Sequence, residues 1–247
     1  MSGHSKWNNI KRRKGAQDAA RGQIFTKLGK EIQMAVKHGG PDPNTNRALE
    51  DAIRKAKSNN MPNDSINRSI SKASSSDSAD FDEMIYEGYG PGGVAVILRS
   101  LTDNRNRTAG EVRHLFDKSG GNLGESGSVG FMFERKGSII LDKERYPDDE
   151  TVMMEALDAG AEDITVQDNY YEVVTAPNEF HQVLNALQEM GYAIEDGSVE
   201  YKPLTMTKLE DPEDQAKMEK LLENLEDFED VNDIWHNWDM PEDADED

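Results

Sequence analysis

Basic side chains dominate the first 37 residues of the chain, where nine Lys and Arg residues face only Asp18 and Glu31. A lysine or arginine can neutralise a phosphate, and an indole ring such as that of Trp7 can stack on a base. The cluster therefore predicts a nucleic-acid contact made by Lys6, Trp7, Lys11, Arg12, Arg13, Lys14, Arg21, Lys27 and Lys30. The alternative is a solvated basic tail, or a segment that only looks like a nuclear-localisation signal at residues 11–14.

A second basic pair follows an expected strand, in the segment Thr102-Asp-Asn-Arg-Asn-Arg-Thr. Arg105 and Arg107 lie at the start of an expected helix, where free backbone N–H groups favour an anion. They could clamp a phosphate, since a guanidinium binds an oxyanion through two parallel hydrogen bonds. They could equally form ordinary ion pairs with the acidic remainder of the chain. Both alternatives stay open, and the two arginines join the predicted contact residues.

Catalytic and metal-binding patterns are absent from the sequence. The chain has no cysteine, and its five histidines include no helical His-x-x-x-His pair for zinc. Gly88-x-Gly90-x-x-Gly93 matches a dinucleotide fingerprint, but Pro91 interrupts it and a strand is expected to follow, so we interpret it as a tight turn. No two carboxylates show a recognisable acid–base spacing. We therefore expect a protein that is not an enzyme, with no catalytic residue, metal site, cofactor or small-molecule substrate.

The formal net charge of −21 conceals two oppositely charged parts. Residues 1–74 contain 15 Lys and Arg against 6 Asp and Glu, whereas residues 75–247 contain 13 against 43. A basic head on an acidic body is typical of a protein with a polyanionic partner. The acidic stretch 210–247 could fold back on the head and limit non-specific binding, or it could serve only solubility.

The head is expected to be helical. Apolar residues recur at helical spacing over 24–36, and Gly39-Gly40 ends this helix. A second helix is expected over 48–56 and a short third one near 66–70. A serine-rich linker then closes a small three-helix domain.

The acidic body is expected to contain two α+β domains. Residues 136–203 read as β-α-β-β-α-β, the order of a ferredoxin-like domain. Flanking fragments form a second set of the same kind, with strands at 94–101, 129–133, 204–207 and 231–235 and helices at 106–118 and 212–226. The predicted class is thus α+β, with a three-helix N-terminal domain and two ferredoxin-like domains, the third inserted in the second. The predicted boundaries are 1–78 for the basic helical domain, 81–135 plus 204–238 for the discontinuous domain, 136–203 for the inserted domain and 239–247 for an acidic tail.

Membrane association is not expected. No apolar run approaches the ~20 residues of a membrane span, and the polar N-terminal segment is no signal peptide. We therefore expect a soluble, cytoplasmic protein without a membrane partner.

Several motifs, taken in order, resemble the YebC/PmpR family over essentially the whole chain. They are Ser2-Gly-His-Ser-Lys-Trp, Ala16-Gln-Asp-Ala, Tyr86-Glu-Gly-Tyr-Gly-Pro-Gly-Gly, Asp103-Asn-Arg-Asn-Arg-Thr and Gly120-Gly-Asn-Leu-Gly. The resemblance implies three domains and no catalytic residues. It also implies one of two functions, because family members are named as probable DNA-binding transcriptional regulators, whereas others are linked to translation in mitochondria or on ribosomes stalled at proline-rich sequence.

Two functional hypotheses follow, with the same basic surface in both. In the first, the protein is a transcriptional regulator that binds promoter DNA. In the second, it is a translation factor that binds ribosomal RNA or tRNA and has the ribosome as a partner. The sequence shows no clear helix-turn-helix reader, and basic arms suit phosphate-rich RNA as well as DNA.

Overall fold

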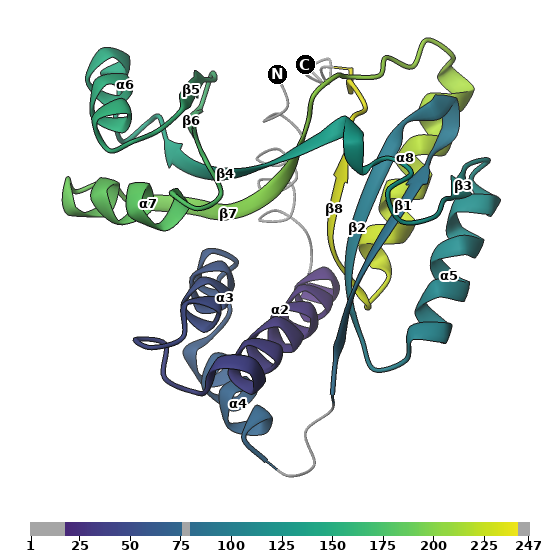
Figure 1. Ribbon diagram of the computed structural model, residues 1–247, viewed down its shortest axis with the longest axis horizontal. Coiled ribbons are helices and arrows are strands. Elements are labelled where there is room, and N and C mark those ends of the chain that lie inside the picture. Colours follow the sequence, from purple (N-terminus) through teal and green to yellow (C-terminus); the bar gives the residue numbers. More distant parts are fainter. Residues whose placement is uncertain (1–17, 76–79, 242–247) are drawn as a thin grey trace.

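The computed structural model describes residues 18–75 and 80–241, with side chains from Gly22 onward. Helices come first, and two four-stranded antiparallel sheets with their own helices follow (Figure 1). The α+β class predicted from the sequence is therefore confirmed.

The N-terminal part is made of three helices, α2 (Asp18–Gly39), α3 (Arg47–Ser58) and α4 (Asn63–Ala73). Leu28 and Ile32 on α2 are buried against the other two helices, because residues four apart share one face of a helix. Asn46 caps α3, since its side chain accepts a hydrogen bond from the Leu49 amide at 3.2 Å. The same side chain donates to the Ala35 carbonyl at 2.8 Å, which ties the start of α3 to α2.

The first sheet has the strand order β3-β1-β2-β8, with all neighbours antiparallel. Its strands are β1 (Asp82–Tyr89), β2 (Ala95–Thr102), β3 (Asn122–Leu123) and β8 (Val231–His236). Between β1 and β2 the chain turns tightly: the Gly90 amide donates to the Val94 carbonyl at 2.7 Å, and Gly92 has φ of 64°. The glycine motif therefore forms a hairpin turn, as predicted. Helices α5 (Arg105–Lys118) and α8 (Pro212–Asp227) pack on one face of this sheet.

The strand order of the first sheet differs from the expected one at a single position. In a ferredoxin-like sheet, the first, second and fourth strand positions are here taken by β2, β3 and β8, which α5 and α8 accompany. The third position belongs to β1. The strand expected near 204–207 is wrong, because this segment forms only the isolated bridge Thr207–Trp238. β1 takes the place because it pairs with β2 along its whole length, from Asp82–Thr102 to Tyr89–Ala95.

The strand expected over 129–133 is also wrong. Residues Gly130–Met132 form a 3₁₀ turn, and β4 (Phe133–Asp142) begins only after it. The Glu87 carboxylate on β1 explains the turn, because it accepts hydrogen bonds from the amides of Gly127 at 2.8 Å, Val129 at 2.9 Å and Gly130 at 2.7 Å. Amides that point to one carboxylate are not available for a strand ladder.

The second sheet is formed entirely by the segment inserted between β3 and α8. Its strand order is β5-β6-β4-β7, with β5 (Asp163–Val166), β6 (Tyr170–Thr175) and β7 (Ile194–Pro203). Helices α6 (Asp149–Asp158) and α7 (Phe180–Glu189) complete the predicted β-α-β-β-α-β order. Both helices pack on one face of the sheet, around Tyr171 and Leu184.

The two sheets meet on the face of the first sheet that α5 and α8 leave free. Ile97 of β2 packs there with Val129 and Phe133, and the ring centroids of Tyr201 on β7 and Trp235 on β8 lie 5.0 Å apart. The long strands β4 and β7 therefore run from the second sheet toward the first (Figure 1). The predicted boundary between residues 135 and 136 falls inside β4.

Candidate nucleic-acid interface

The predicted contact residues fall into two groups. Lys6, Trp7, Lys11, Arg12, Arg13 and Lys14 lie outside the described residues, as does the side chain of Arg21. Their role stays a prediction. The remaining four are Lys27, Lys30, Arg105 and Arg107, and each contacts carboxylates or carbonyls of the acidic body.

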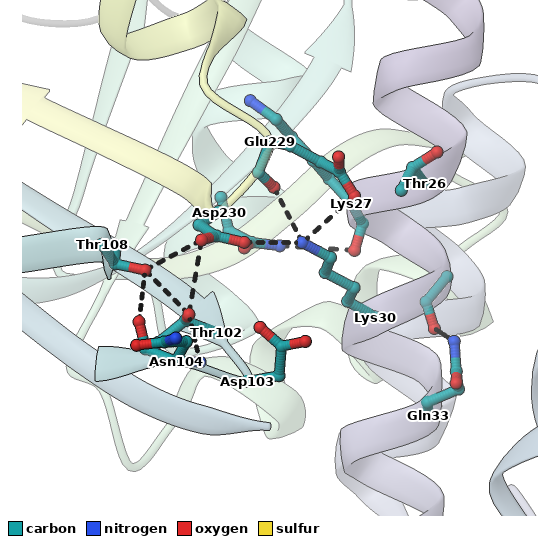
Figure 2. A network of polar contacts seen from close by, with 12 residues as sticks. Thr26, Lys27, Lys30, Gln33, Thr102, Asp103, Asn104, Thr108, Glu229 and Asp230 are labelled. Atoms are coloured by element: carbon teal, nitrogen blue, oxygen red, sulfur yellow. Dashed lines mark hydrogen bonds and ion pairs between the residues drawn. The ribbon is translucent and has the colours of Figure 1, made fainter. Parts of the chain in front are cut away.

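Lys30 on α2 and Asp230 just before β8 form the centre of the contact between the helices and the first sheet (Figure 2). The Lys30 Nζ lies 2.9 Å from Asp230 Oδ1 and 3.3 Å from the Glu229 carbonyl. The other carboxylate oxygen of Asp230 accepts hydrogen bonds from Thr108 at 2.8 Å and from Arg107 at 2.9 Å. The Thr102 hydroxyl lies 3.3 Å from the same oxygen, so two cations and two hydroxyls surround a carboxylate that is 4% exposed.

The ionisation of Asp230 follows from these contacts. Burial alone would raise the pKa of this carboxyl, but the hydrogen bonds from Arg107, Lys30 and Thr108 outweigh burial and hold the pKa below its ordinary value. Asp230 is therefore charged at neutral pH. Lys30 and Arg107 are held by this fixed negative charge.

A second charge cluster continues the same contact. Asp233 on β8 lies 2.9 Å from the Lys55 Nζ of α3 and 2.6 Å from the Arg99 Nε of β2. Glu31 of α2 accepts from Lys55 at 2.9 Å and lies 3.1 Å from Arg99. Burial opposes the charge on Asp233, but Lys55 and Arg99 outweigh it and lower the pKa of Asp233. Nearby, the Lys27 Nζ donates to a carbonyl at the end of α8. The basic head therefore contacts the acidic body mainly through charged side chains.

The two loop arginines are also paired. Arg105 donates two hydrogen bonds to Asp82, at 2.8 and 2.6 Å, and Arg107 donates to Asp103 at 2.8 Å. The structure thus shows the ion-pair alternative that the sequence left open. The side chains of Arg105 and Arg107 are 62% and 52% exposed, so water and salt weaken their ion pairs with Asp82 and Asp103. A phosphate could compete for them, and that role stays a prediction.

A groove of about 650 Å³ opens between α2, α4 and the turn before α5. Its α4 wall carries Arg68 and Lys72, which the sequence reasoning did not select. Both side chains are exposed, and neither forms an ion pair with a carboxylate of the described residues. Their spacing of four residues places them one turn apart on one helix face, so the sequence itself indicates two neighbouring cations. This pair was not predicted as a contact site because the basic residues of α4 are sparse.

Two other kinds of site are absent from the described part of the molecule. No helix within residues 18–75 and 80–241 is long and apolar enough to cross a membrane. No group of three or more His, Asp or Glu side chains in the same ranges is placed to hold a metal ion. The groove presents cations, hydroxyls and aromatic rings, which are groups that bind phosphates and bases.

Comparison with known proteins identifies the family. The model of the TACO1/YebC protein N-terminal domain matches residues 5–76, and the model of the TACO1/YebC second and third domain matches residues 81–238. The chain therefore belongs to the TACO1/YebC family, as the motifs predicted.

Individual relatives agree with this assignment. The chain is 56% identical, over the full length of both proteins, to a "Probable transcriptional regulatory protein" of Ruminiclostridium cellulolyticum. It is 54% identical to a protein of the same name from Acetivibrio thermocellus, across 96% of this chain and 99% of the relative. The crystal structure of a conserved hypothetical protein from Aquifex aeolicus is similar with a TM-score of 0.84 and 42% identity, covering 93% of this chain and 95% of that one. At the level of the family, the relatives are thus named as regulators of transcription.

Proposed function

We propose that this member of the TACO1/YebC family regulates gene expression by binding nucleic acid through its basic head, without catalysis, and that promoter DNA is its target. The separation of charge along the chain carries the proposal: 15 Lys and Arg against 6 Asp and Glu in residues 1–74, and 13 against 43 in the rest. Only the head attracts a polyanion, since the body repels it.

The contacts between the basic head and the acidic body indicate the side from which nucleic acid approaches the head. Lys30 and Lys55 are ion-paired with Asp230 and Asp233, and Lys27 donates to a carbonyl at the end of α8, so these three cations are already engaged. On the α4 wall of the groove, Arg68 and Lys72 have no carboxylate partner among the described residues. Nucleic acid would therefore approach the head at the α4 wall.

A second candidate function is binding of ribosomal RNA or tRNA by a translation factor. The observation that favours it is the position of Arg68 and Lys72, which line the wall of a groove. A recognition helix that reads a DNA duplex must protrude into the major groove. A pair of cations on the wall of a groove suits a single-stranded, unstacked nucleotide better, which is the form in which RNA is most often read.

The experiment that tests the proposal compares nucleic-acid binding and ribosome association of the same variants. In the head variant, Lys11, Arg12, Arg13 and Lys14 are changed to Ala. In a charge-matched control, Arg113, Lys118, Arg135 and Lys208 are changed to Ala; none of these four forms an ion pair among the described residues. Affinity for labelled promoter DNA and for RNA is measured by fluorescence anisotropy against salt, and ribosome association by sedimentation of cell lysate.

The outcomes separate the two candidates. If about five head cations meet the phosphates of a duplex, the slope of log K against log salt is about −4 to −5 for the wild type and clearly shallower for the head variant only. Sequence-specific DNA binding that survives competitor DNA would support transcription. Ribosome co-sedimentation that the head variant loses would support translation. Equal affinities for the head and control variants would contradict both.

A further inference from the structure

We propose that the groove between α2, α4 and the turn before α5 is a binding site for one unstacked nucleotide of a single strand, with its phosphate against Arg68 and Lys72 and its base against Gln33. This inference rests on the proposed function, because it names the subsite at which the head would hold a nucleic acid. It adds residues outside the N-terminal basic run. It also predicts a preference for single strands.

The first argument is the distribution of charge in the groove. Three carboxylates line it, and they are already paired: Asp230 with Lys30 and Arg107, Asp103 with Arg107, and Glu229 with Lys30 at 3.4 Å. The pairs sit on the side of the groove that faces β8. On the opposite wall, Arg68 and Lys72 have no carboxylate partner among the described residues, so a phosphate there gains attraction without displacing an existing pair.

The second argument is a buried acceptor without a donor. Gln33 lines the groove and is 6% exposed. Its amide nitrogen donates to the Gly29 carbonyl at 3.0 Å, which fixes the amide and leaves Oε1 as the free atom (Figure 2). Within the described residues Oε1 has no hydrogen-bond partner. A buried acceptor is costly when unpaired, and a base N–H would supply the missing donor once the side chains that cover Oε1 move aside.

The third argument is the composition of the remaining lining. Phe25, Phe81 and Phe228 reach the groove, and all three are partly exposed. The Lys30 Nζ lies 5.8 Å from the centre of the Phe81 ring, so that ring already faces a cation. Phe25 and Phe228 make no ring contact of this kind in the described structure and offer apolar surface to a base, whose π face stacks on an aromatic ring whatever its identity.

The size of the groove agrees with a single nucleotide. Its volume of about 650 Å³ lies inside the range of roughly 300–1,000 Å³ that is usual for sites of small ligands. A double helix cannot enter a space of this size. An unstacked nucleotide at an end, loop or bulge can.

The test uses the full chain, fluorescein-labelled RNA and DNA hexamers of adenosine, and two matched variants. Arg68→Gln with Lys72→Gln removes the proposed phosphate contacts. Arg113→Gln with Lys118→Gln removes two exposed cations of α5 that do not line the groove. We expect the first variant to weaken hexamer binding roughly tenfold and to reduce the salt slope by about 0.7, the value for one phosphate contact on a single strand. The second variant should bind like the wild type.

Two further measurements locate the ligand. Gln33→Met keeps the shape of the side chain and removes the acceptor. The substitution should weaken binding of the adenosine hexamer three- to tenfold. A hexamer of purine riboside lacks the exocyclic amine, so the wild type and Gln33→Met should bind it with equal affinity. The methyl group of Met61, which is 6% exposed and lines the groove, should shift in a ¹³C-methyl NMR titration with the hexamer. Melting temperatures of the variants establish that all of them are folded.

The results distinguish a failed groove from a failed function. If the hexamers bind and the head variant loses binding, but Arg68→Gln with Lys72→Gln behaves like its control and Met61 does not shift, the groove inference is overturned and the proposed function stands. If the wild type binds neither hexamer nor duplex, both fail. A duplex that binds more tightly than the single strand through Arg68 and Lys72 would also overturn the inference, because the groove admits no duplex.

Discussion

Asp233 offers the sharpest test of how the basic head is held on the acidic body. Its carboxylate lies 2.9 Å from Lys55 on α3 and 2.6 Å from Arg99 on β2, while Glu31 of α2 contacts the same two cations. Arg99 also lies 3.2 Å from the Glu83 carboxylate of β1, so three carboxylates and two cations from five elements form this cluster. Asp233→Asn keeps the shape of the side chain and removes the carboxylate that contacts both Lys55 and Arg99.

The size of the effect follows from burial. Removing one partner of a fully buried ion pair costs about 3–5 kcal/mol, because the other charge loses both water and its partner. The Asp233 side chain is 23% exposed, so water partly replaces it, and we expect about 2–3 kcal/mol. For a chain of 150–250 residues this lowers the melting temperature by about 5–10 °C.

Differential scanning calorimetry at pH 7 measures this shift. The control is Asp117→Asn on the exposed surface of α5, which has no ion pair among the described residues and should leave the melting temperature unchanged. Adding Lys55→Met to Asp233→Asn removes one of the two cations that lost this partner and should recover part of the loss. A melting temperature for Asp233→Asn within about 1 °C of the wild type would refute the reasoning.

Three other substitutions test separate parts of the structure. His236 accepts a hydrogen bond from the Trp238 amide at 3.2 Å, and burial lowers the pKa of His236 from 6.5 to about 4. The free energy of unfolding should therefore fall as pH drops from 6.5 toward 4, by at most about 3 kcal/mol. In urea unfolding, His236→Asn should remove this contribution to the pH dependence. Gly137→Ala places a methyl group 2.1 Å from Thr175 Oγ1 and should destabilise the second sheet by about 1–3 kcal/mol in the same assay. Glu87→Ala frees the amides of residues 127–130, whose hydrogen exchange should accelerate while that of β2 does not.

Local patterns in the sequence predicted most of the elements. The helix expected over 106–118 is α5, which starts at Arg105 because the side chain of Asn104 caps it. The Gly88-to-Gly93 motif forms the expected hairpin turn. Such features depend on residues that are close in sequence, so their signals are visible without a structure.

The position of β1 in the first sheet could not be predicted in this way. Segment 204–207 stands before a helix and a strand, as a ferredoxin-like third strand should, but β1 already pairs with β2 over its whole length. Pairing between strands depends on contacts across the fold, and no short-range pattern reports it. The strand expected over 129–133 failed for a similar reason, because Glu87, more than 40 residues away, binds the amides of that turn.

The residues of the candidate site also divide into those that the sequence predicts and those that only tertiary contacts reveal. Counting charges identified a basic head, but it did not reveal that Lys27 and Lys30 face α8 and the segment before β8. Nor did it select Arg68 and Lys72, whose value lies in having no carboxylate partner among the described residues. Ion pairing is decided by tertiary packing, so sequence gives the number of cations and structure gives the number that are free.

The two kinds of charged contact should respond differently to salt, and this difference connects the docking of the head with its proposed function. Asp230 is 4% exposed and Asp233 is 23% exposed on its side chain, so the contacts that hold α2 on the first sheet are shielded from ions. Contacts of Arg68 and Lys72 with phosphate would be exposed, and exposed charges are screened over a Debye length of about 8 Å at physiological ionic strength. Raising the salt concentration should therefore release nucleic acid while the amides of β8 keep their protection from hydrogen exchange. If β8 lost protection at the same salt concentration that released the ligand, the head would be held by screened surface charges and the distinction between docked and free cations would be wrong.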